Sequence, residues 1–153
     1  MTFRIEEKLY IKSEHILDFK EFISKNSCKT LFHPRKIKSL YFDNLKNQMF
    51  MDSEEGITPR KKIRIRNYPD NKNDKFFFEK KISSPEGRFK EKKTLDIGEI
   101  KKMKKFGHFD DIYRSCHPKL FVEYLREYYD ANICRLTIDT NINYSKFNEL
   151  NYI

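Results

Sequence analysis

The sequence predicts an α+β domain that is rich in strands and built on an antiparallel sheet or barrel, with two or three helices beside it. Several segments alternate apolar and polar residues with a period of two, which is typical of half-buried strands. Short turns separate most of these segments, and such turns join antiparallel strands. The 153 residues suit one domain, and 14 Phe and 9 Tyr can fill its core.

The N-terminal third is expected to hold a strand, a helix and a second strand. Residues 4–11 alternate in character and predict the first strand. Ser13 suits a helix N-cap, and the apolar residues after it recur at helical spacing to about residue 25. Pro34 is expected to break the chain before the second strand, at 37–43.

The middle of the chain alternates strands with turns. A short helix or loop is expected at 44–53, and Gly56 and Pro59 mark a turn after it. The segments expected next are a strand at 60–66, a polar hairpin loop at 69–73, a strand at 76–82, a turn at 83–87 and a strand at 88–93.

The last third is expected to hold one helix and a hairpin. Asp96 and Glu99 have the spacing of a capping box, so a helix should run to Phe106, with Gly107 at its C′ position. The hairpin strands are expected at 120–128 and 133–141, with their turn near 130–132.

The charge of the chain favours anionic partners. Its 32 Lys and Arg exceed its 23 Asp and Glu, which gives a net charge of +9. This excess suits nucleic acid, an acidic membrane or phosphorylated molecules, although solubility alone could also explain it. Three widely spaced cysteines indicate reduced thiols, and no apolar run has membrane-spanning length, so a cytoplasmic location is expected.

Cations recur at alternate positions of the expected strands. The strand at 60–66 places Ile63 and Ile65 on one face, together with Lys61, and only cations on the other: Arg60, Lys62, Arg64 and Arg66. The apolar face should pack on the core. The same alternation groups Glu79 with Lys81, Arg88 with Lys90 and Lys92, Tyr124 with Arg126, and Arg135 with Asp139.

Two interpretations of this pattern compete. The charged faces could be the solvated outer surface of an ordinary sheet, where Lys also discourages edge pairing. Alternatively, they could line a barrel or deep cleft, which would be stable only if it were wet or filled by a polyanion. Consecutive phosphates would fit such a space. Carboxylates among the cations could then hold Mg²⁺ or Mn²⁺ against phosphate oxygens.

The ordered set of motifs resembles the VTC (vacuolar transporter chaperone) polyphosphate-polymerase domain, a member of the triphosphate tunnel metalloenzymes. The resemblance covers about residues 3–144. The segments that carry it are Arg4-x-Glu6-x-Lys8, Ser39-Leu40-Tyr41-Phe42-Asp43, 60–68, Phe78-Glu79-Lys80-Lys81, Lys90-x-Lys92, Tyr124-x-Arg126 and 135–141.

The resemblance implies an antiparallel β-tunnel and transfer of the terminal phosphate of ATP onto inorganic polyphosphate, with Mn²⁺ or Mg²⁺. The catalytic residues that it implies are Lys8, Arg64, Arg66, Lys81, Arg126 and Arg135. Further substrate-binding residues would be Arg4, Lys62, Arg88, Lys90, Lys92 and Tyr124. The metal ligands would be Glu6, Glu79 and Asp139.

The sequence departs from the family pattern in two places. Hydrolytic relatives open with Glu-x-Glu-x-Lys, whereas Arg4 stands first here, which favours the VTC type over a triphosphatase or cyclase. The family also has a later strand with a Glu-x-Lys pair, which this sequence lacks. We therefore expect one domain over residues 1–153 that is truncated at its C-terminus and lacks the last strand or strands of the tunnel.

Turnover stays open at this point, so a second function is expected as the alternative. A domain that binds polyphosphate or inositol phosphates without catalysis would keep the cations and tolerate the missing strand. An RNA-binding module is a third option, but nothing in the sequence resembles the aromatic motif of an RRM or the Gly-rich loop of a KH domain.

Overall fold

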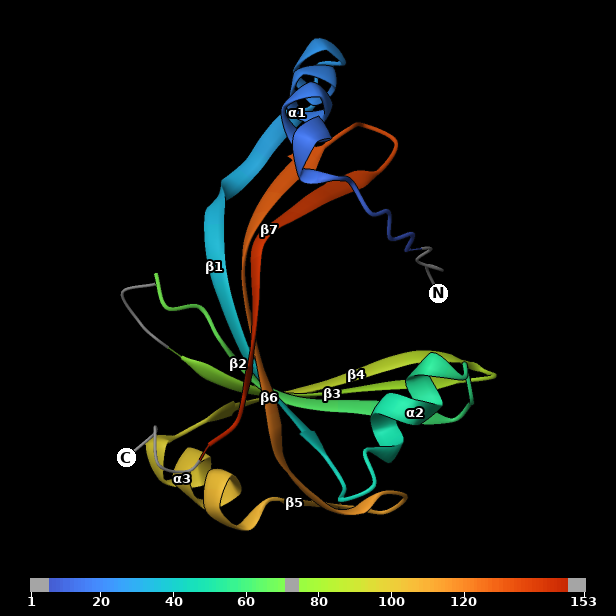
Figure 1. Cartoon of the computed structure of the whole chain (residues 1–153), viewed down its shortest axis with the longest axis vertical. Coiled ribbons are helices and arrows are strands. Elements are labelled where there is room, and N and C mark those ends of the chain that lie inside the picture. The colour runs from blue at the N-terminus through green and yellow to red at the C-terminus, as the bar shows by residue number, and fades with distance from the viewer. Residues whose placement is uncertain (1–5, 71–74, 149–153) are drawn as a thin grey trace. The chain divides into compact units, whose positions relative to one another are not determined.

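The structure is a computed structural model that describes residues 6–70 and 75–148 (Figure 1). In these ranges the chain forms three α-helices, one 3-10 turn and seven strands. The helices and the turn are η1 (Ser13–His15), α1 (Ile16–Lys25), α2 (Gln48–Glu54) and α3 (Ile97–Phe106). The strands are β1 (Lys29–Asp43), β2 (Arg60–Asn67), β3 (Phe76–Ser84), β4 (Gly87–Leu95), β5 (His108–Asp110), β6 (Arg114–Asp130) and β7 (Arg135–Lys146).

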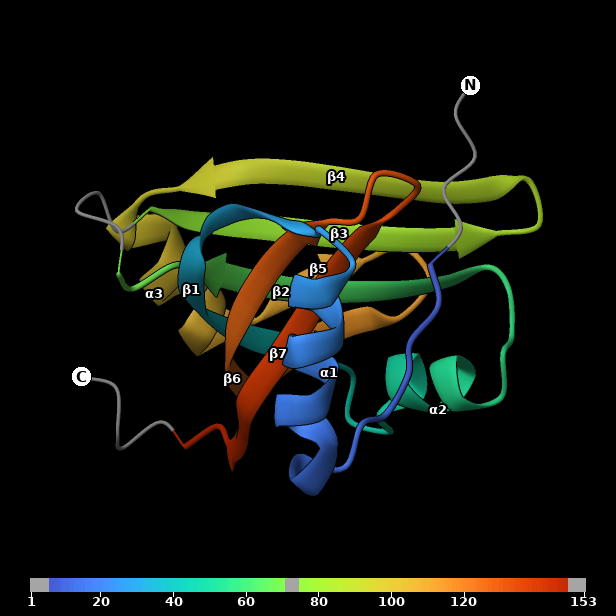
Figure 2. The ribbon, with the colours of Figure 1, turned by 90° about the horizontal axis from the view of Figure 1, so that it is seen from above.

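The strands form one sheet in the order β4-β3-β2-β1-β6-β5, and β7 also pairs with β6. The pairings of β1 with β2, β2 with β3, β3 with β4 and β5 with β6 are antiparallel. In Figure 2 the strands β2, β3 and β4 run side by side along their whole length. The α+β, β-rich antiparallel class that the sequence predicts is therefore confirmed.

The chain divides into two compact units. Unit 1 comprises Met1–His33 and Glu127–Ile138, and unit 2 comprises Pro34–Arg126 and Asp139–Ile153. Within unit 1, Lys20 Nζ donates to Glu127 Oε1 at 2.7 Å, and the Phe32 ring meets the Tyr128 ring edge-on with centroids 5.6 Å apart. These contacts tie the N-terminal segments of this unit to the end of β6.

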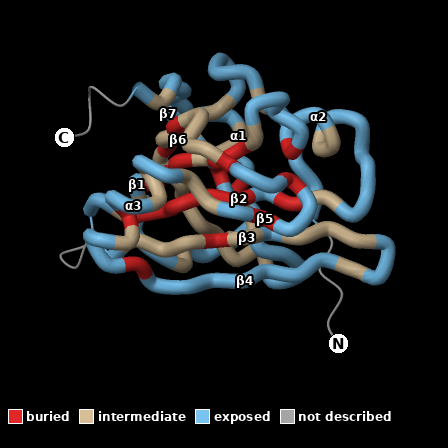
Figure 3. Tube along the Cα trace, turned by 90° about the horizontal axis from the view of Figure 1, so that it is seen from below, coloured by how far each residue is buried: buried red, intermediate tan, exposed pale blue. Residues whose placement is uncertain are grey.

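The core of unit 2 lies on one face of its sheet. Alternate residues of β1 and β2 fill it, together with residues of β4, α2, α3 and β6. Its buried members are Leu40, Phe42, Met49, Ile63, Ile65, Leu95, Ile100, Tyr113, Cys116 and Phe121. Figure 3 shows buried residues along β1 and β2, whereas β4 is mostly exposed. The opposite face of β2, β3 and β4 is left for the charged residues.

Helix α3 begins as the sequence predicts. The Asp96 side chain accepts from the Glu99 backbone N–H at 2.7 Å, and the Glu99 side chain accepts from the Asp96 N–H at 3.0 Å. Both halves of the capping box are therefore present. Gly107 ends the helix with a φ of 79°, and a Cβ at this position would meet the Cys116 carbonyl oxygen at 2.4 Å. Only glycine fits this end of the helix.

Three predictions about the N-terminal third are wrong. Residues 6–11 form no strand, and Tyr10 in this segment is 90% exposed. The alternation of apolar and polar residues suits a strand, but it does not provide the neighbouring strand that a sheet requires. Ser13 makes no capping hydrogen bond and lies in the 3-10 turn instead. Pro34 does not break the chain, since β1 runs through it. The register of β1 with β2 covers only 38–42, so the missing N–H of Pro34 costs no bond in that ladder.

Elsewhere the strands are longer than predicted. β6 and β7 extend beyond 120–128 and 133–141, and β5 was not predicted. The predicted loop at 69–73 falls partly outside the described residues. No helix within the described ranges is both long enough and apolar enough to cross a membrane.

Candidate functional site

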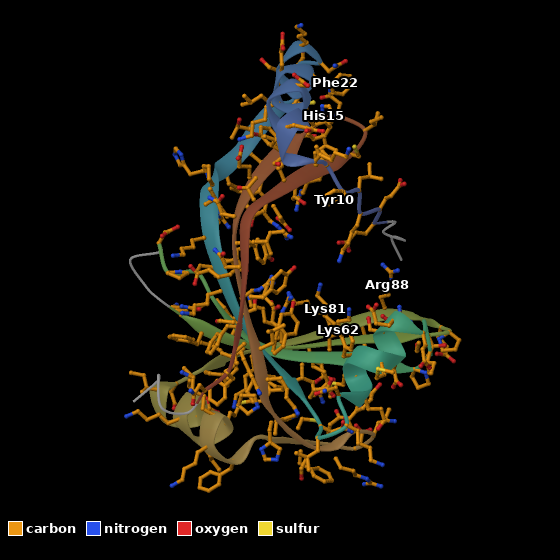
Figure 4. The ribbon with its side chains drawn as sticks, viewed as in Figure 1. Tyr10, His15, Phe22, Lys62, Lys81 and Arg88 are labelled. Atoms are coloured by element: carbon orange, nitrogen blue, oxygen red, sulfur yellow. The ribbon has the colours of Figure 1, made fainter. Side chains whose placement is uncertain are left out.

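The pairing register of β2, β3 and β4 gathers cations on one face of the sheet. The residues of this cationic face lie in four cross-strand rows: Arg60-Ser83-Arg88, Lys62-Lys81-Lys90, Arg64-Glu79-Lys92 and Arg66-Phe77-Thr94. Of these twelve described positions, eight are cationic and Glu79 alone is anionic. Figure 4 shows Lys62, Lys81 and Arg88 projecting from the same side of the sheet. Separate strands thus contribute to one electropositive surface.

Glu79 holds two of these cations together. It is 1% exposed, and its Oε2 accepts from Arg64 Nε at 2.8 Å and from Arg64 Nη2 at 2.6 Å. Its Oε1 lies 2.7 Å from Lys90 Nζ. Bonds to both carboxylate oxygens offset much of the free energy that is lost when charged groups are buried away from water. Glu79 therefore fixes a cation from β2 and one from β4 across the strand between them.

The protonation of this group follows from its partners. Burial opposes ionisation of Glu79, but the hydrogen bond from Lys90 and the charge of Arg64 outweigh it and lower the pKa of Glu79 to about 2. Burial also works against the charge of Arg64, yet Tyr41 and Glu79 raise the pKa of its guanidinium. Both groups are ionised at neutral pH.

Two residues of β1 aim the buried guanidinium groups. Arg64 Nη1 donates to the Tyr41 hydroxyl at 2.9 Å, and Arg66 Nε donates to Ser39 Oγ at 3.0 Å. Arg66 Nη2 also donates to the Tyr124 hydroxyl at 3.1 Å. The sequence interpretation did not identify Ser39 as part of the site. The signal was available, because Ser39 and Tyr41 alternate on one face of the predicted strand at 37–43.

Most of the other cations of the face are solvent-exposed, and Arg60 is half-buried. Lys62, Lys81, Arg88, Lys90 and Lys92 are exposed, whereas Arg64 and Arg66 are 7% and 8% exposed. The face thus has a buried floor of two guanidinium groups and a rim of exposed cationic side chains. Several cations on one face can together neutralise an anion that has several charged groups.

A further ion pair lies next to Tyr124. Arg126 Nε and Nη2 reach the two carboxylate oxygens of Asp139 at 2.5 Å and 2.6 Å. The Arg126 guanidinium also lies 5.1 Å from the centre of the Tyr124 ring. Since 124 and 126 alternate along β6, both side chains leave the same face of that strand. β6 and β7 therefore add one more cation, already paired with a carboxylate.

The remaining predicted site residues are not members of these cross-strand rows. Lys8, Glu6 and Arg135 are exposed residues of unit 1, so their part in the site stays a prediction. Arg4 lies outside the described residues. The structure thus brings together the predicted residues of β2, β3 and β4, with Tyr124 from β6.

The predicted metal ligands do not form a metal site among the described residues. Both oxygens of Glu79 are bonded to cations, and so are both oxygens of Asp139. Within residues 6–70 and 75–148, no three Asp, Glu, His or Cys side chains lie close enough to hold one ion. A hard cation here would take most of its oxygen ligands from phosphate and water.

Lys61, the exception on the apolar face of β2, has its own buried partner. Lys61 Nζ lies 3.0 Å and 3.1 Å from the two oxygens of Asp110, and it also contacts Asp111. Lys61 is 6% exposed and Asp110 is 1% exposed. The carboxylates of this segment therefore neutralise the lysine on the core side of the sheet, away from the cationic face.

Asp43 acts in the fold rather than in the site. Its carboxylate accepts from the backbone N–H groups of Asn44, Met49 and Phe50 at 2.8–3.0 Å. The bonds from Met49 and Phe50 satisfy donors in the first turn of α2, whose N-cap residue Asn47 makes no capping bond with its side chain. Asp43 therefore caps this turn and the start of α2.

Comparison with known proteins identifies the family. A search of curated proteins found no match. One solved structure found is a Bacillus halodurans protein with a proposed adenylate cyclase activity. It shares 15% identity with this chain and has a TM-score of 0.49, over 90% of this chain and 76% of that one. Residues 3–151 match the family model described as the VTC domain. The chain belongs to the VTC domain family.

Proposed function

We propose that this domain binds phosphate chains on the cationic face of β2, β3 and β4 and transfers the terminal phosphate of ATP onto inorganic polyphosphate. The observation that supports the proposal is the set of cross-strand rows, in which eight cations share one face with one carboxylate. A chain of consecutive phosphates has the matching charge and can contact several rows at once. Membership of the VTC domain family agrees with such a ligand.

The buried and exposed cations would have different tasks in this reaction. Tyr41 and Glu79 hold Arg64, and Ser39 and Tyr124 hold Arg66, so both guanidinium groups are oriented before a ligand arrives. Preorganised charge needs little rearrangement during a reaction. The exposed lysines would close on the phosphates as they bind. Phosphate-binding roles for Lys8, Arg126 and Arg135 remain part of the proposal.

The transfer itself needs no protein nucleophile. A terminal oxygen of polyphosphate attacks the γ-phosphorus of ATP, the bond from that phosphorus to the β–γ bridging oxygen breaks, and ADP leaves. The polyphosphate chain gains one phosphate. Positioned cations would stabilise the charge on the equatorial oxygens in the transition state. Because no three ligating side chains cluster among the described residues, we assign no step to Mn²⁺ or Mg²⁺.

A second function, binding without turnover, has its own support. The predicted metal ligands Glu79 and Asp139 are bound to cations, and no cluster of three ligating side chains lies within the described part of the chain. A domain that binds polyphosphate or inositol phosphates needs the cations but not a metal centre. This function uses the same face and the same residues.

Incubation with ATP and Mn²⁺, followed by a polyphosphate gel, separates the two functions. Growth of the phosphate chain would support the polymerase. Tight binding of polyphosphate without growth would support the binding domain. Failure to bind polyphosphate at low salt would refute both.

The location of the site can be tested with charge-matched variants. We expect Lys62→Ala and Lys81→Ala each to weaken tripolyphosphate binding about tenfold, because a hydrogen bond to a charged group contributes about 1.5–3 kcal/mol. The control is Lys101→Ala, which removes the same charge from an exposed position on α3. Calorimetric titration gives the affinities. Equal effects of all three substitutions would show that only net charge matters.

A further inference from the structure

The cationic face ends on an aromatic pair. In the row of Arg66 and Thr94, the middle position is Phe77, an apolar ring among charged neighbours. Phe77 meets Tyr68 with ring centroids 6.2 Å apart and an angle of 66° between the planes. Both residues are half-buried, so each keeps part of its surface in contact with solvent.

The pair lies beside cations that could hold phosphate. Lys92 Nζ lies over one side of the Phe77 ring, 3.7 Å from its centre, so a base that stacks on that side must displace it, and Arg66 stands opposite Phe77 in the register. Successive rows are about 7 Å apart, because a strand rises about 3.3 Å per residue. The row of Lys62 and Lys81 is therefore about 13 Å from Phe77. A ligand that spans these rows would have phosphate at one end and the ring at the other.

The two tyrosines that contact the buried arginines of this face have a different role. The hydroxyl groups of Tyr41 and Tyr124 accept hydrogen bonds from Arg64 and Arg66. Phe77 has no polar atom and cannot hold a guanidinium in this way. Its ring can offer only apolar area and a π-face, and these are what a planar heterocycle uses when it stacks.

We infer that Phe77 and Tyr68 form a stacking site for the base of a nucleoside triphosphate whose phosphates extend over the neighbouring cations. This inference rests on the proposed function and specifies where its nucleotide substrate places the base. Stacking on an aromatic side chain tolerates any base, because every base has a π-face. The site therefore favours nucleotides as a class and does not select adenine.

The first test compares two ligands on one variant. Phe77→Leu keeps an apolar side chain against Tyr68 and removes the ring. Without metal, we expect this variant to bind ATP about tenfold more weakly than wild type and tripolyphosphate within about twofold, since only ATP carries a base. Phe89→Leu is the control, because Phe89 lies on the opposite face of β4 and is 58% exposed.

The second test uses the absence of tryptophan from the sequence. Phe77→Trp makes residue 77 the sole indole, and base stacking should quench its fluorescence. We expect ATP and GTP to quench it and tripolyphosphate to leave it unchanged, while Phe89→Trp responds to none of them. Phe77→Trp should also bind ATP as tightly as wild type.

The possible outcomes separate this inference from the proposed function. If Phe77→Leu weakens both ligands equally, or if ATP binds Phe77→Trp without quenching, then Phe77 only packs the sheet and the stacking site is refuted. In that case tripolyphosphate binding by the wild type still supports the phosphate site. If the wild type binds neither ligand, both proposals fail.

Discussion

At the scale of single residues, the site depends on how buried charges are neutralised. Glu79 is a buried member of the cationic face and bonds to Arg64 and Lys90 from different strands. A buried carboxylate with two cationic partners contributes to stability only while it is ionised. The same residue is thus both a stabilising element of the sheet and the group that orients the cations bonded to it.

The pH dependence of stability should reveal this role. The pKa of Glu79 falls from 4.5 to about 2, so its contribution is fully present above pH 4.5 and is lost as the pH falls toward 2. A shift of this size corresponds to on the order of 3 kcal/mol. We expect the wild type to be more stable than Glu79→Gln at neutral pH, and the gap to narrow on acidification.

Urea unfolding at a series of pH values from 7 to 3 measures this gap. The control is Glu54→Gln, which removes an exposed carboxylate from α2. A gap between wild type and Glu79→Gln that stays constant across this range would contradict the assignment.

At the scale of elements, α3 illustrates how local signals serve the core. Its capping box satisfies backbone donors at the N-terminus, and Gly107 ends it. Ile100 on its inner side is buried in the core cluster, against which Met103 also packs. The helix thus covers the apolar face of the sheet, whose opposite face carries the cations.

The cap of α3 should therefore affect the stability of the whole unit. We expect Asp96→Ala to lower the free energy of unfolding by about 1 kcal/mol, because it leaves the Glu99 N–H without its acceptor. Lys102→Ala, at an exposed position of the same helix, should change it by less than about 0.5 kcal/mol. Thermal or urea unfolding, followed by circular dichroism, compares them. Equal losses in the two variants would show that the cap contributes little here.

At the scale of the whole molecule, the net charge of +9 matters through its distribution. Many of the cations lie on one face of β2, β3 and β4, while others, such as Lys101, lie on helix surfaces. A polyanion that binds the face releases counterions in proportion to the cations that it contacts. Affinity should therefore depend steeply on salt concentration.

The salt dependence can be resolved to single cations. We expect the logarithm of the polyphosphate binding constant to fall linearly with the logarithm of salt concentration. Lys62→Ala and Lys81→Ala should each reduce this slope by about one, and Lys101→Ala should leave it unchanged. Titrations at four or more salt concentrations give the slopes. A slope that Lys101→Ala reduces as much as Lys62→Ala would argue against a localised site.

Several features followed from the sequence alone. The alternation of Arg60, Lys62, Arg64 and Arg66 fixed which residues share a face, because side chains on a strand alternate with a period of two. The capping box at Asp96 placed the start of α3, since capping involves residues only three positions apart. Both signals are local, and the structure confirms both.

Only the tertiary structure decided which groups face each other. The period of two does not say what lies across a face, so it could not pair Lys61 with Asp110 or assign Ser39 and Tyr41 to the two buried arginines. It also made residues 6–11 look like a strand, although a strand exists only where a partner completes its ladder. The sequence determined the faces of the strands. Burial, partners and the division of the cations into a buried floor and an exposed rim came from long-range contacts, which no local pattern encodes.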